Sequence, residues 1–187
     1  KLCLTKNYLY PKKIVQETLN NIKDNINVEE INIENEVVEE KHFSKETNKI
    51  ITKEENDLMK FGTKVHEIFE LLDFRNMDLS LVDNKFIRNK VEKFLSNDLL
   101  KNISNANIYK EYEFIYNKDN NEYHGIIDLM LEYDNHIDII DYKLKGITDE
   151  NYIKQLNGYK EYIEKISNKN VSTYLYSILD EKVLQIN

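Results

Sequence analysis

The stretch of sequence that decides the fold is residues 125–159, which read GIIDLMLEYDNHIDIIDYKLKGITDENYIKQLNGY. Residues 125–132 and 137–143 are short apolar runs rich in isoleucine, and the turn signal Tyr-Asp-Asn at 133–135 separates them. Apolar runs joined by such a turn predict a hairpin of two buried β-strands. The residues that follow, up to Tyr159, predict an amphipathic helix.

Two acids and a lysine interrupt these apolar strands: Asp128 in the first run, and Asp141 and Lys143 in the second. Because side chains alternate between the faces of a strand, Asp141 and Lys143 are expected on one face and Tyr142 on the other. The hairpin could bring Asp128 alongside them. Burying such charges in isolation costs several kcal/mol each. A hard cation such as Mg²⁺ would offset this cost, since it binds carboxylates, carbonyls and water.

Beside such a cation, Lys143 could orient or deprotonate a water molecule, or stabilise the charge on a phosphoryl oxygen. Taken alone, an Asp-x-Lys sequence on a strand is more often a surface ion pair. The next helix adds context, because Gln155 and Tyr159 are one turn apart and therefore face the same side.

Three motifs of this stretch together resemble the PD-(D/E)xK nucleases, and specifically the exonuclease domains of the RecB/AddA type. The motifs are GIID at 125–128, DYK at 141–143 and YxxQLxxY at 152–159. The resemblance implies an α/β fold with a restriction-endonuclease-like core, in which helices flank a central mixed β-sheet. Leu144 departs from the family pattern, because relatives usually have a small hydroxyl residue there, and local phosphate or water contacts are in question.

The resemblance also implies roles for individual residues. The metal ligands would be His66, Asp128, Asp141 and the backbone carbonyl of Tyr142. Lys143 would act in catalysis together with Asp128 and Asp141, and Gln155 and Tyr159 would support the lysine or the DNA strand. Glu111 would be a supporting acid. From the residues alone, a lone histidine is more often a surface or core residue. Glu111 is equally well explained as a solvated strand residue.

The rest of the chain supplies further elements. Apolar residues recur at helical spacing from Glu54 to Leu72 and predict a helix of about five turns that contains His66. A second helical pattern covers residues 78–103. The expected strands are 107–116, rich in Tyr, Phe and Ile, and two closing strands at 171–179 and 182–186. We expect an entry segment and acidic connector over 1–55 and the nuclease core over 56–187.

Composition limits the kinds of protein that the chain can be. Its 187 residues are 41% hydrophobic and 32% charged, as in globular proteins, and no apolar run is long enough for a membrane span. We therefore expect a cytoplasmic protein with no membrane partner. A single cysteine, Cys3, excludes an iron–sulfur cluster bound by this chain alone. The net charge of −8 argues against a free-standing duplex binder, since DNA affinity depends on phosphate neutralisation.

These observations and the resemblance give one expected function. The chain would be a Mg²⁺-dependent deoxyribonuclease, with Mn²⁺ as an alternative ion, that digests single-stranded DNA as an exonuclease in double-strand-break repair. No helicase motif is present, so ATP would act only through a helicase region upstream or in a partner helicase–nuclease subunit. The alternatives are a non-catalytic module of the same fold that binds DNA or protein, and a stand-alone endonuclease.

Overall fold

The computed structural model describes residues 53–76, 78–80, 82–118 and 121–186 of the chain. The entry segment and connector that we expect over 1–55 lie outside the described residues, apart from the last three positions. Those three positions belong to the first turn of helix α2, which spans Lys53–Leu71. None of the helices in the described ranges is long and apolar enough to cross a membrane.

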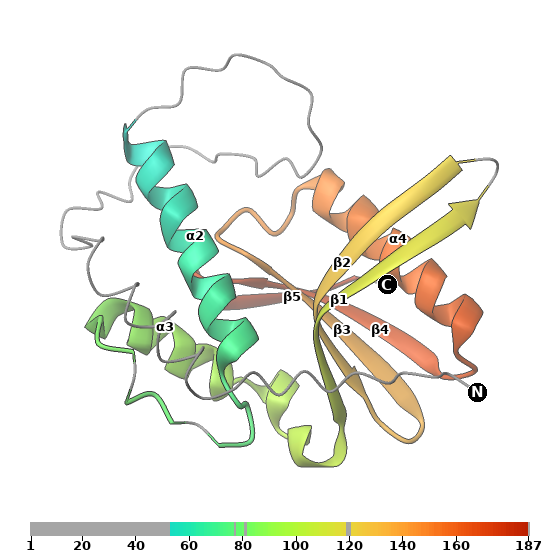
Figure 1. Ribbon diagram of the computed structural model, residues 1–187, viewed down its shortest axis with the longest axis horizontal. Helices are drawn as coiled ribbons and strands as arrows, with labels where there is room; N and C mark the ends of the chain where they lie inside the picture. The colour runs from blue at the N-terminus through green and yellow to red at the C-terminus, as the bar shows by residue number, and fades with distance from the viewer. Residues whose placement is uncertain (1–52, 77, 81, 119–120, 187) are drawn as a thin grey trace.

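A five-stranded sheet in the order β1-β2-β3-β4-β5 forms the centre of the molecule (Figure 1). Its strands are β1 (Asn107–Lys118), β2 (Asn121–Glu132), β3 (His136–Lys143), β4 (Asn170–Ser177) and β5 (Lys182–Ile186). The β3–β4 pair is parallel and the other three pairs are antiparallel. The sheet is therefore mixed, and the prediction of an α/β fold with a mixed central sheet is confirmed.

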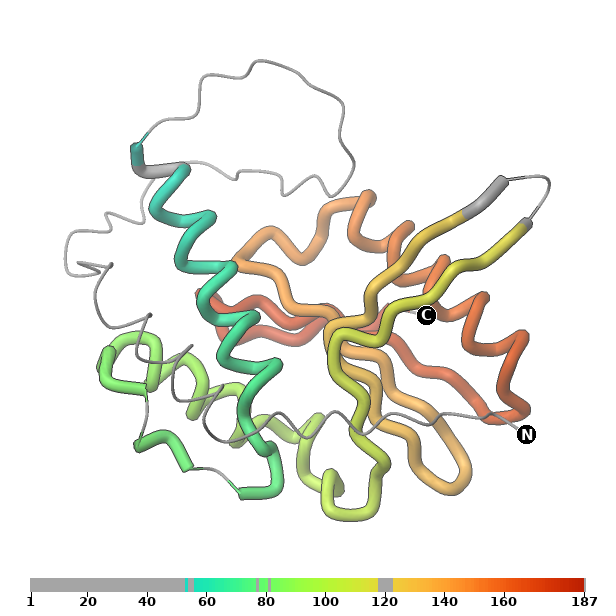
Figure 2. Tube along the Cα trace, viewed as in Figure 1, coloured from blue at the N-terminus to red at the C-terminus, as the bar shows by residue number. Residues whose placement is uncertain are grey.

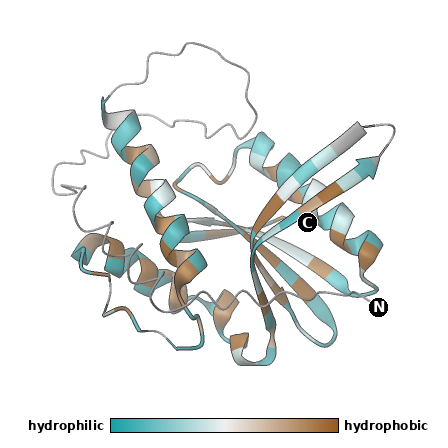
Figure 3. Cartoon of the chain, in the orientation of Figure 1, coloured by the Kyte–Doolittle hydropathy of each residue, from teal (hydrophilic) through white to brown (hydrophobic). Residues whose placement is uncertain are grey.

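Three helices of the described residues pack against this sheet, and each has alternating hydrophobic and hydrophilic segments along its length (Figure 3). They are α2, α3 (Lys85–Leu95) and α4 (Glu150–Ile166). Helix α4 connects the parallel strands β3 and β4, which cannot be joined by a tight turn. Asp149 caps its N-terminus by accepting a hydrogen bond from the backbone N–H of Asn151 at 2.7 Å.

The second helical segment is shorter than its sequence pattern over 78–103 predicts. Asn84 caps the start of α3, where its side chain accepts hydrogen bonds from two backbone N–H groups. Asn97 then starts a separate 3₁₀ turn, Asp98–Leu100, and a second 3₁₀ turn follows at Ile103–Asn105. Asparagine side chains compete for backbone hydrogen bonds, which is why the apolar spacing continues while the helix does not.

The sheet separates two hydrophobic cores. The first core lies under α2 and α3, and among its members are Phe61, Ile68, Phe69, Val91, Phe94, Leu129, Leu131, Tyr142 and Tyr176. The second core lies under α4, and among its members are Phe114, Ile127, Met130, Ile139, Leu156, Tyr159 and Leu175. Because both faces of the sheet are covered, seven of the eight residues of β3 are buried, including its two aspartates and its lysine.

Strand β1 exchanges its two faces at Glu111. Tyr109 and Tyr112 both pack against the second core, with ring centroids 6.3 Å apart, although residues three apart in a regular strand lie on opposite faces. The backbone of Glu111 is left-handed, with φ of 47°, and this is an uncommon conformation for a residue with a side chain. The left-handed residue therefore reverses the inside and outside faces of the strand.

Strand β2 changes faces at the position opposite, Asp128. Ile127 packs in the second core and Leu129 packs in the first, although they are two residues apart. The ladder between β1 and β2 pairs Lys110 with Leu129 and Tyr112 with Ile127, and it omits the positions in between. The trace of both strands bends partway along their length (Figure 2). Beyond the bend the hairpin of β1 and β2 projects away from the rest of the sheet.

Candidate functional site

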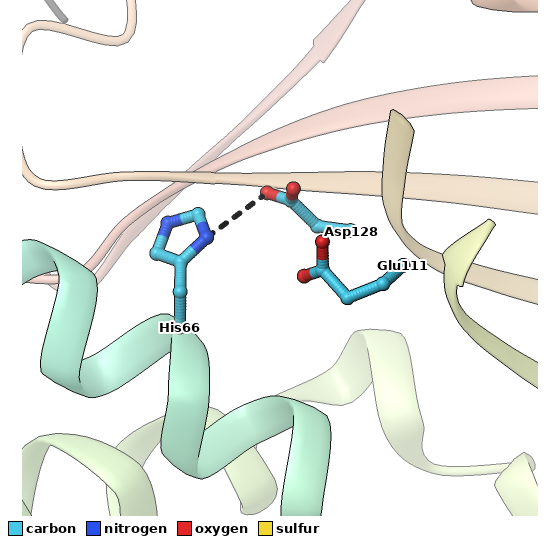
Figure 4. Close-up of side chains that lie close together, drawn as sticks. All are labelled: His66, Glu111 and Asp128. Carbon is cyan, nitrogen blue, oxygen red and sulfur yellow. Dashed lines mark ion pairs between the residues drawn. The ribbon is translucent and has the colours of Figure 1, made fainter. Parts of the chain in front are cut away.

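Three potential metal ligands meet beside the bend of the β1–β2 hairpin. One ligand atom from each of His66, Glu111 and Asp128 lies within 4.8 Å of the other two, and all three residues are half-buried. His66 projects from α2 toward the two carboxylates, as Figure 4 shows. Its Nδ1 lies 3.8 Å from Asp128 Oδ2. We call these three residues the metal cluster.

The carboxylate of Asp128 is fixed by the neighbouring strand. Its Oδ2 accepts a hydrogen bond from the backbone N–H of Tyr142 at 2.7 Å. The regular ladder between β2 and β3 ends at Leu129 and Ile140. Beyond that pair, the Asp128 side chain forms the hydrogen bond between the two strands. The metal cluster therefore lies where β2 separates from β3.

The acid and the lysine of the DYK motif form a second group, on the α4 side of β3. Lys143 Nζ lies 2.8 Å from Asp141 Oδ2, and both residues are buried. Burial alone would lower the pKa of Lys143, but the carboxylates of Asp141 and Asp128 outweigh it and raise the pKa above its usual value. Tyr142, between them in the sequence, faces the first core, as strand alternation predicts.

Helix α4 holds the ammonium group of Lys143 from the other side. Lys143 Nζ donates a hydrogen bond to Gln155 Oε1 at 3.3 Å and lies 4.7 Å from the centre of the Tyr152 ring. Gln155 Nε2 in turn donates to the hydroxyl of Tyr159 at 2.8 Å. Because the tyrosine occupies the amide nitrogen, the amide oxygen is directed at the lysine.

The metal cluster and the Asp141–Lys143 pair are electrostatically linked. The negative charge of Asp141 contributes to the raised pKa of Glu111, and the charge of Asp128 contributes to the raised pKa of Lys143. The metal cluster nevertheless does not include Asp141, whose carboxylate contacts the lysine instead. The third member of the metal cluster is Glu111.

The charge of the metal cluster suits a cation. Burial, followed by the neighbouring carboxylate of Asp128, raises the pKa of Glu111 to about 7, although the charge of His66 acts in the opposite direction. A divalent ion would remove the repulsion between the two carboxylates. Carboxylate oxygens suit Mg²⁺ and Mn²⁺, and the imidazole nitrogen is a ligand that transition metals accept more readily than Mg²⁺ does. The donor set therefore fits a hard or borderline divalent ion.

A half-buried lysine next to the metal cluster was not identified from the sequence. Lys110 donates hydrogen bonds to the backbone carbonyls of Glu70, at 3.2 Å, and of Leu72. Its Nζ also lies 4.1 Å from the centre of the Phe74 ring. Burial lowers the pKa of Lys110 to about 8, against the charges of Asp73 and Glu70. Its partners are main-chain carbonyls, which leave no signal in a sequence.

Comparisons with known proteins give relatives of one kind. No protein-family model matches the chain. The chain is 27% identical, over 95% of its own length and 18% of the relative's, to the ATP-dependent helicase/nuclease AddA subunit of Clostridioides difficile. It is 32% identical to the corresponding AddA subunit from Clostridium beijerinckii, over 66% of the chain and 12% of that protein.

A third AddA subunit, from Clostridium acetobutylicum, is 27% identical over 62% of the chain and 13% of its own length. The chain thus spans less than a fifth of the length of each of these curated relatives. On these similarities the chain is homologous to one part of the AddA subunit of ATP-dependent helicase/nucleases.

Proposed function

We propose that the chain hydrolyses DNA phosphodiester bonds with a divalent metal ion, as the nuclease part of a helicase–nuclease. The observation that carries the proposal is the position of the Asp141–Lys143 pair beside the metal cluster, where β2 separates from β3. Carboxylates that hold a cation next to a buried ammonium group are the elements that phosphodiester hydrolysis requires. The site would be of the PD-(D/E)xK type.

The residues that would hold the ion are His66, Asp128 and Asp141, with the Tyr142 carbonyl, and the close approach of Glu111 favours it as a further ligand. When bound, Mg²⁺ or Mn²⁺ supplies Lewis acidity toward a phosphoryl oxygen and acidifies a water molecule. Asp128 is already oriented for this role by the Tyr142 N–H. Asp141 would share its carboxylate between the ion and Lys143.

Lys143 would supply positive charge to the phosphate during hydrolysis. Its ammonium group is held in one direction by Asp141 and by Gln155, so little reorganisation is needed as negative charge develops. Tyr159 maintains the amide of Gln155 in the orientation that presents its oxygen. Gln155 and Tyr159 would therefore position the lysine.

The substrate would be single-stranded DNA. The chain would digest it as an exonuclease during double-strand-break repair in the cytoplasm. The names of the relatives include both a helicase and a nuclease activity, and this supports a helicase upstream or in a partner protein. ATP would be used only there. A net charge of −8 favours delivery of the strand by such a motor over its capture from solution.

The test uses the 187-residue chain with end-labelled single-stranded DNA and separately with the corresponding duplex. We expect cleavage of the single strand with Mg²⁺ or Mn²⁺, loss of cleavage with EDTA, and recovery when the metal is added in excess. Added salt should weaken binding, because phosphate contacts are screened. Undiminished cleavage in EDTA would refute the metal mechanism. Absence of both metal binding and cleavage would favour a non-catalytic module that binds DNA or protein.

A further inference from the structure

Lys110 connects the two elements that carry the histidine and one acid of the metal cluster. It lies on β1, directly before Glu111, and it is half-buried. Its ammonium group reaches the end of α2, where it donates to the carbonyl oxygens of Glu70 and Leu72. The Phe74 ring covers it at 4.1 Å. A single side chain therefore ties the strand to the helix.

The end of α2 requires such a partner. The last carbonyl groups of a helix have no partner within the helix, and the helix dipole places partial negative charge there. Helix α2 has no basic residue in its own last turn. Lys110 supplies the missing cation from the neighbouring strand. The contact thus satisfies the carbonyls and the dipole together.

This contact also fixes the distance between two ligands. His66 precedes Glu70 by four residues, which is about one helical turn. Glu111 follows Lys110 directly, and its left-handed backbone turns its carboxylate toward the histidine. Sliding of β1 along α2 would separate the two ligand atoms, which now lie within 4.8 Å of each other.

We propose that Lys110 is a positioning residue for the metal cluster, because it anchors β1 to the end of α2 and so sets the His66–Glu111 distance. The proposal rests on the proposed function of the same site, and it adds a residue that acts through the metal ligands and is not itself one of them. Residues that orient metal ligands from outside the ligand shell typically change metal affinity by about 10- to 100-fold when replaced.

The chain contains a matched control for this contact. Lys90 on α3 donates to the backbone carbonyl of Leu179 at 2.7 Å and lies 5.6 Å from the centre of the Phe86 ring. It also pairs with Glu181 at 2.9 Å. Lys90 thus resembles Lys110 in carbonyl and ring contacts, but it joins α3 to the turn between β4 and β5.

The experiment compares Mn²⁺ binding by the DNA-free wild-type chain, Lys110→Met, Lys110→Arg and Lys90→Met, using titration calorimetry. We expect Lys110→Met to weaken Mn²⁺ binding about tenfold, Lys110→Arg to recover part of the loss, and Lys90→Met to bind as the wild type does. Thermal unfolding of each variant shows how much folded protein is present. Lys110→Gln keeps a polar head for the carbonyls and replaces the methionine variant if that variant does not fold.

Cleavage assays across metal concentrations separate positioning from general destabilisation. For Lys110→Met, the Mn²⁺ concentration at half-maximal rate should rise about tenfold while the plateau rate is regained. A purely structural loss would lower the plateau without moving the midpoint. Equal Mn²⁺ affinities of wild type and Lys110→Met would overturn the role of Lys110 alone. No Mn²⁺ binding by the wild type would overturn the proposed function together with this inference.

Discussion

Glu111 on β1 lies opposite Asp128 on β2, at the position that the ladder between the two strands omits. Two carboxylates opposite each other on adjacent strands repel, and such pairs destabilise a sheet. Here the repulsion coincides with a left-handed backbone at Glu111, which costs free energy of its own. In the metal-free protein, repulsion and backbone strain thus coincide at the place where the proposed ion would bind.

The first prediction concerns this repulsion. Glu111→Gln should raise the free energy of unfolding of the metal-free protein at pH 8 by about 1 kcal/mol, after allowance for solvent screening. The same substitution should reduce the stabilisation that added Mn²⁺ provides. Thermal unfolding in EDTA and in Mn²⁺ measures both effects. Glu113→Gln is the control, because Glu113 is exposed on the same strand.

The gain in the free energy of unfolding from Glu111→Gln should depend on pH. The pKa of Glu111 is raised from 4.5 to about 7, so the folded protein holds this proton more tightly than the unfolded chain does. Stability is therefore lost as the pH rises from about 4.5 to about 7. Glu111→Gln should gain little over the wild type at pH 5 and most above pH 7. Equal gains at both pH values would contradict this explanation.

The second prediction separates the two members of the DYK pair. Asp141→Asn should weaken both metal binding and cleavage, whereas Lys143→Met should bind metal as well as the wild type or better, because the ammonium group repels the cation. Cleavage by Lys143→Met at saturating metal should fall by about 100-fold or more. Metal titration beside single-turnover cleavage shows the difference.

Asp138→Asn is the control for this comparison, since Asp138 lies on the same strand and pairs with His136 instead. It should leave the cleavage rate unchanged. If Lys143→Met cleaves at the wild-type rate, Lys143 is only an ion-pair partner. In that case the assignment of Asp141 and Lys143 to catalysis is wrong.

The third prediction uses two glycines. A Cβ atom at Gly125 would collide with the Phe114 ring and lie 2.9 Å from Tyr159 Cε1, whereas a Cβ at Gly158 meets nothing within 4 Å. Gly125→Ala should displace Tyr159, and with it Gln155, and lower the cleavage rate. Gly158→Ala should stabilise α4 by about 0.5–1 kcal/mol without changing the rate. Thermal unfolding and cleavage measured together distinguish the two variants.

A fourth prediction concerns a buried tyrosine in the first core. The hydroxyl of Tyr176 has no hydrogen-bond partner among the described residues. Tyr176→Phe should therefore raise the free energy of unfolding by about 1 kcal/mol. Tyr109→Phe should lower it by a similar amount, since the Tyr109 hydroxyl donates to Glu132 Oε2 at 3.0 Å. Denaturant unfolding tests the opposite signs, and loss of stability in both variants would mean that the Tyr176 hydroxyl has a partner.

Apolar runs, a turn signal and helical spacing were enough to predict most of the described fold. The strands at 125–132 and 137–143 and the helix around His66 follow from them, because both faces of β3 and one face of α2 are buried. The bend at Glu111 was not predictable. It breaks the alternation on which strand prediction depends, and a left-handed glutamate has no signature in a sequence.

Part of the candidate site was likewise predictable from the sequence, and part depends on tertiary packing. Asp141 and Lys143 are two residues apart on one strand, so their contact follows from local geometry. The meeting of His66, Glu111 and Asp128 depends instead on how α2 docks against the bend, which is tertiary information. The helical pattern over 78–103 was wrong in its extent, because Asn84 and Asn97 cap shorter segments.

The pairing of β3 has a consequence for local unfolding. Asp141, Tyr142 and Lys143 lie beyond the last rung shared with β2, and their backbone ladder is formed with β4, at Leu175, Tyr176 and Ser177. Fluctuations that detach the hairpin of β4 and β5 would therefore remove the backbone ladder of the DYK segment while the β1–β2 hairpin stays intact. Backbone amide hydrogen exchange in the DYK segment should therefore occur at the rate of exchange in β4. The local stability of β4 and β5 would then determine how often the site unfolds.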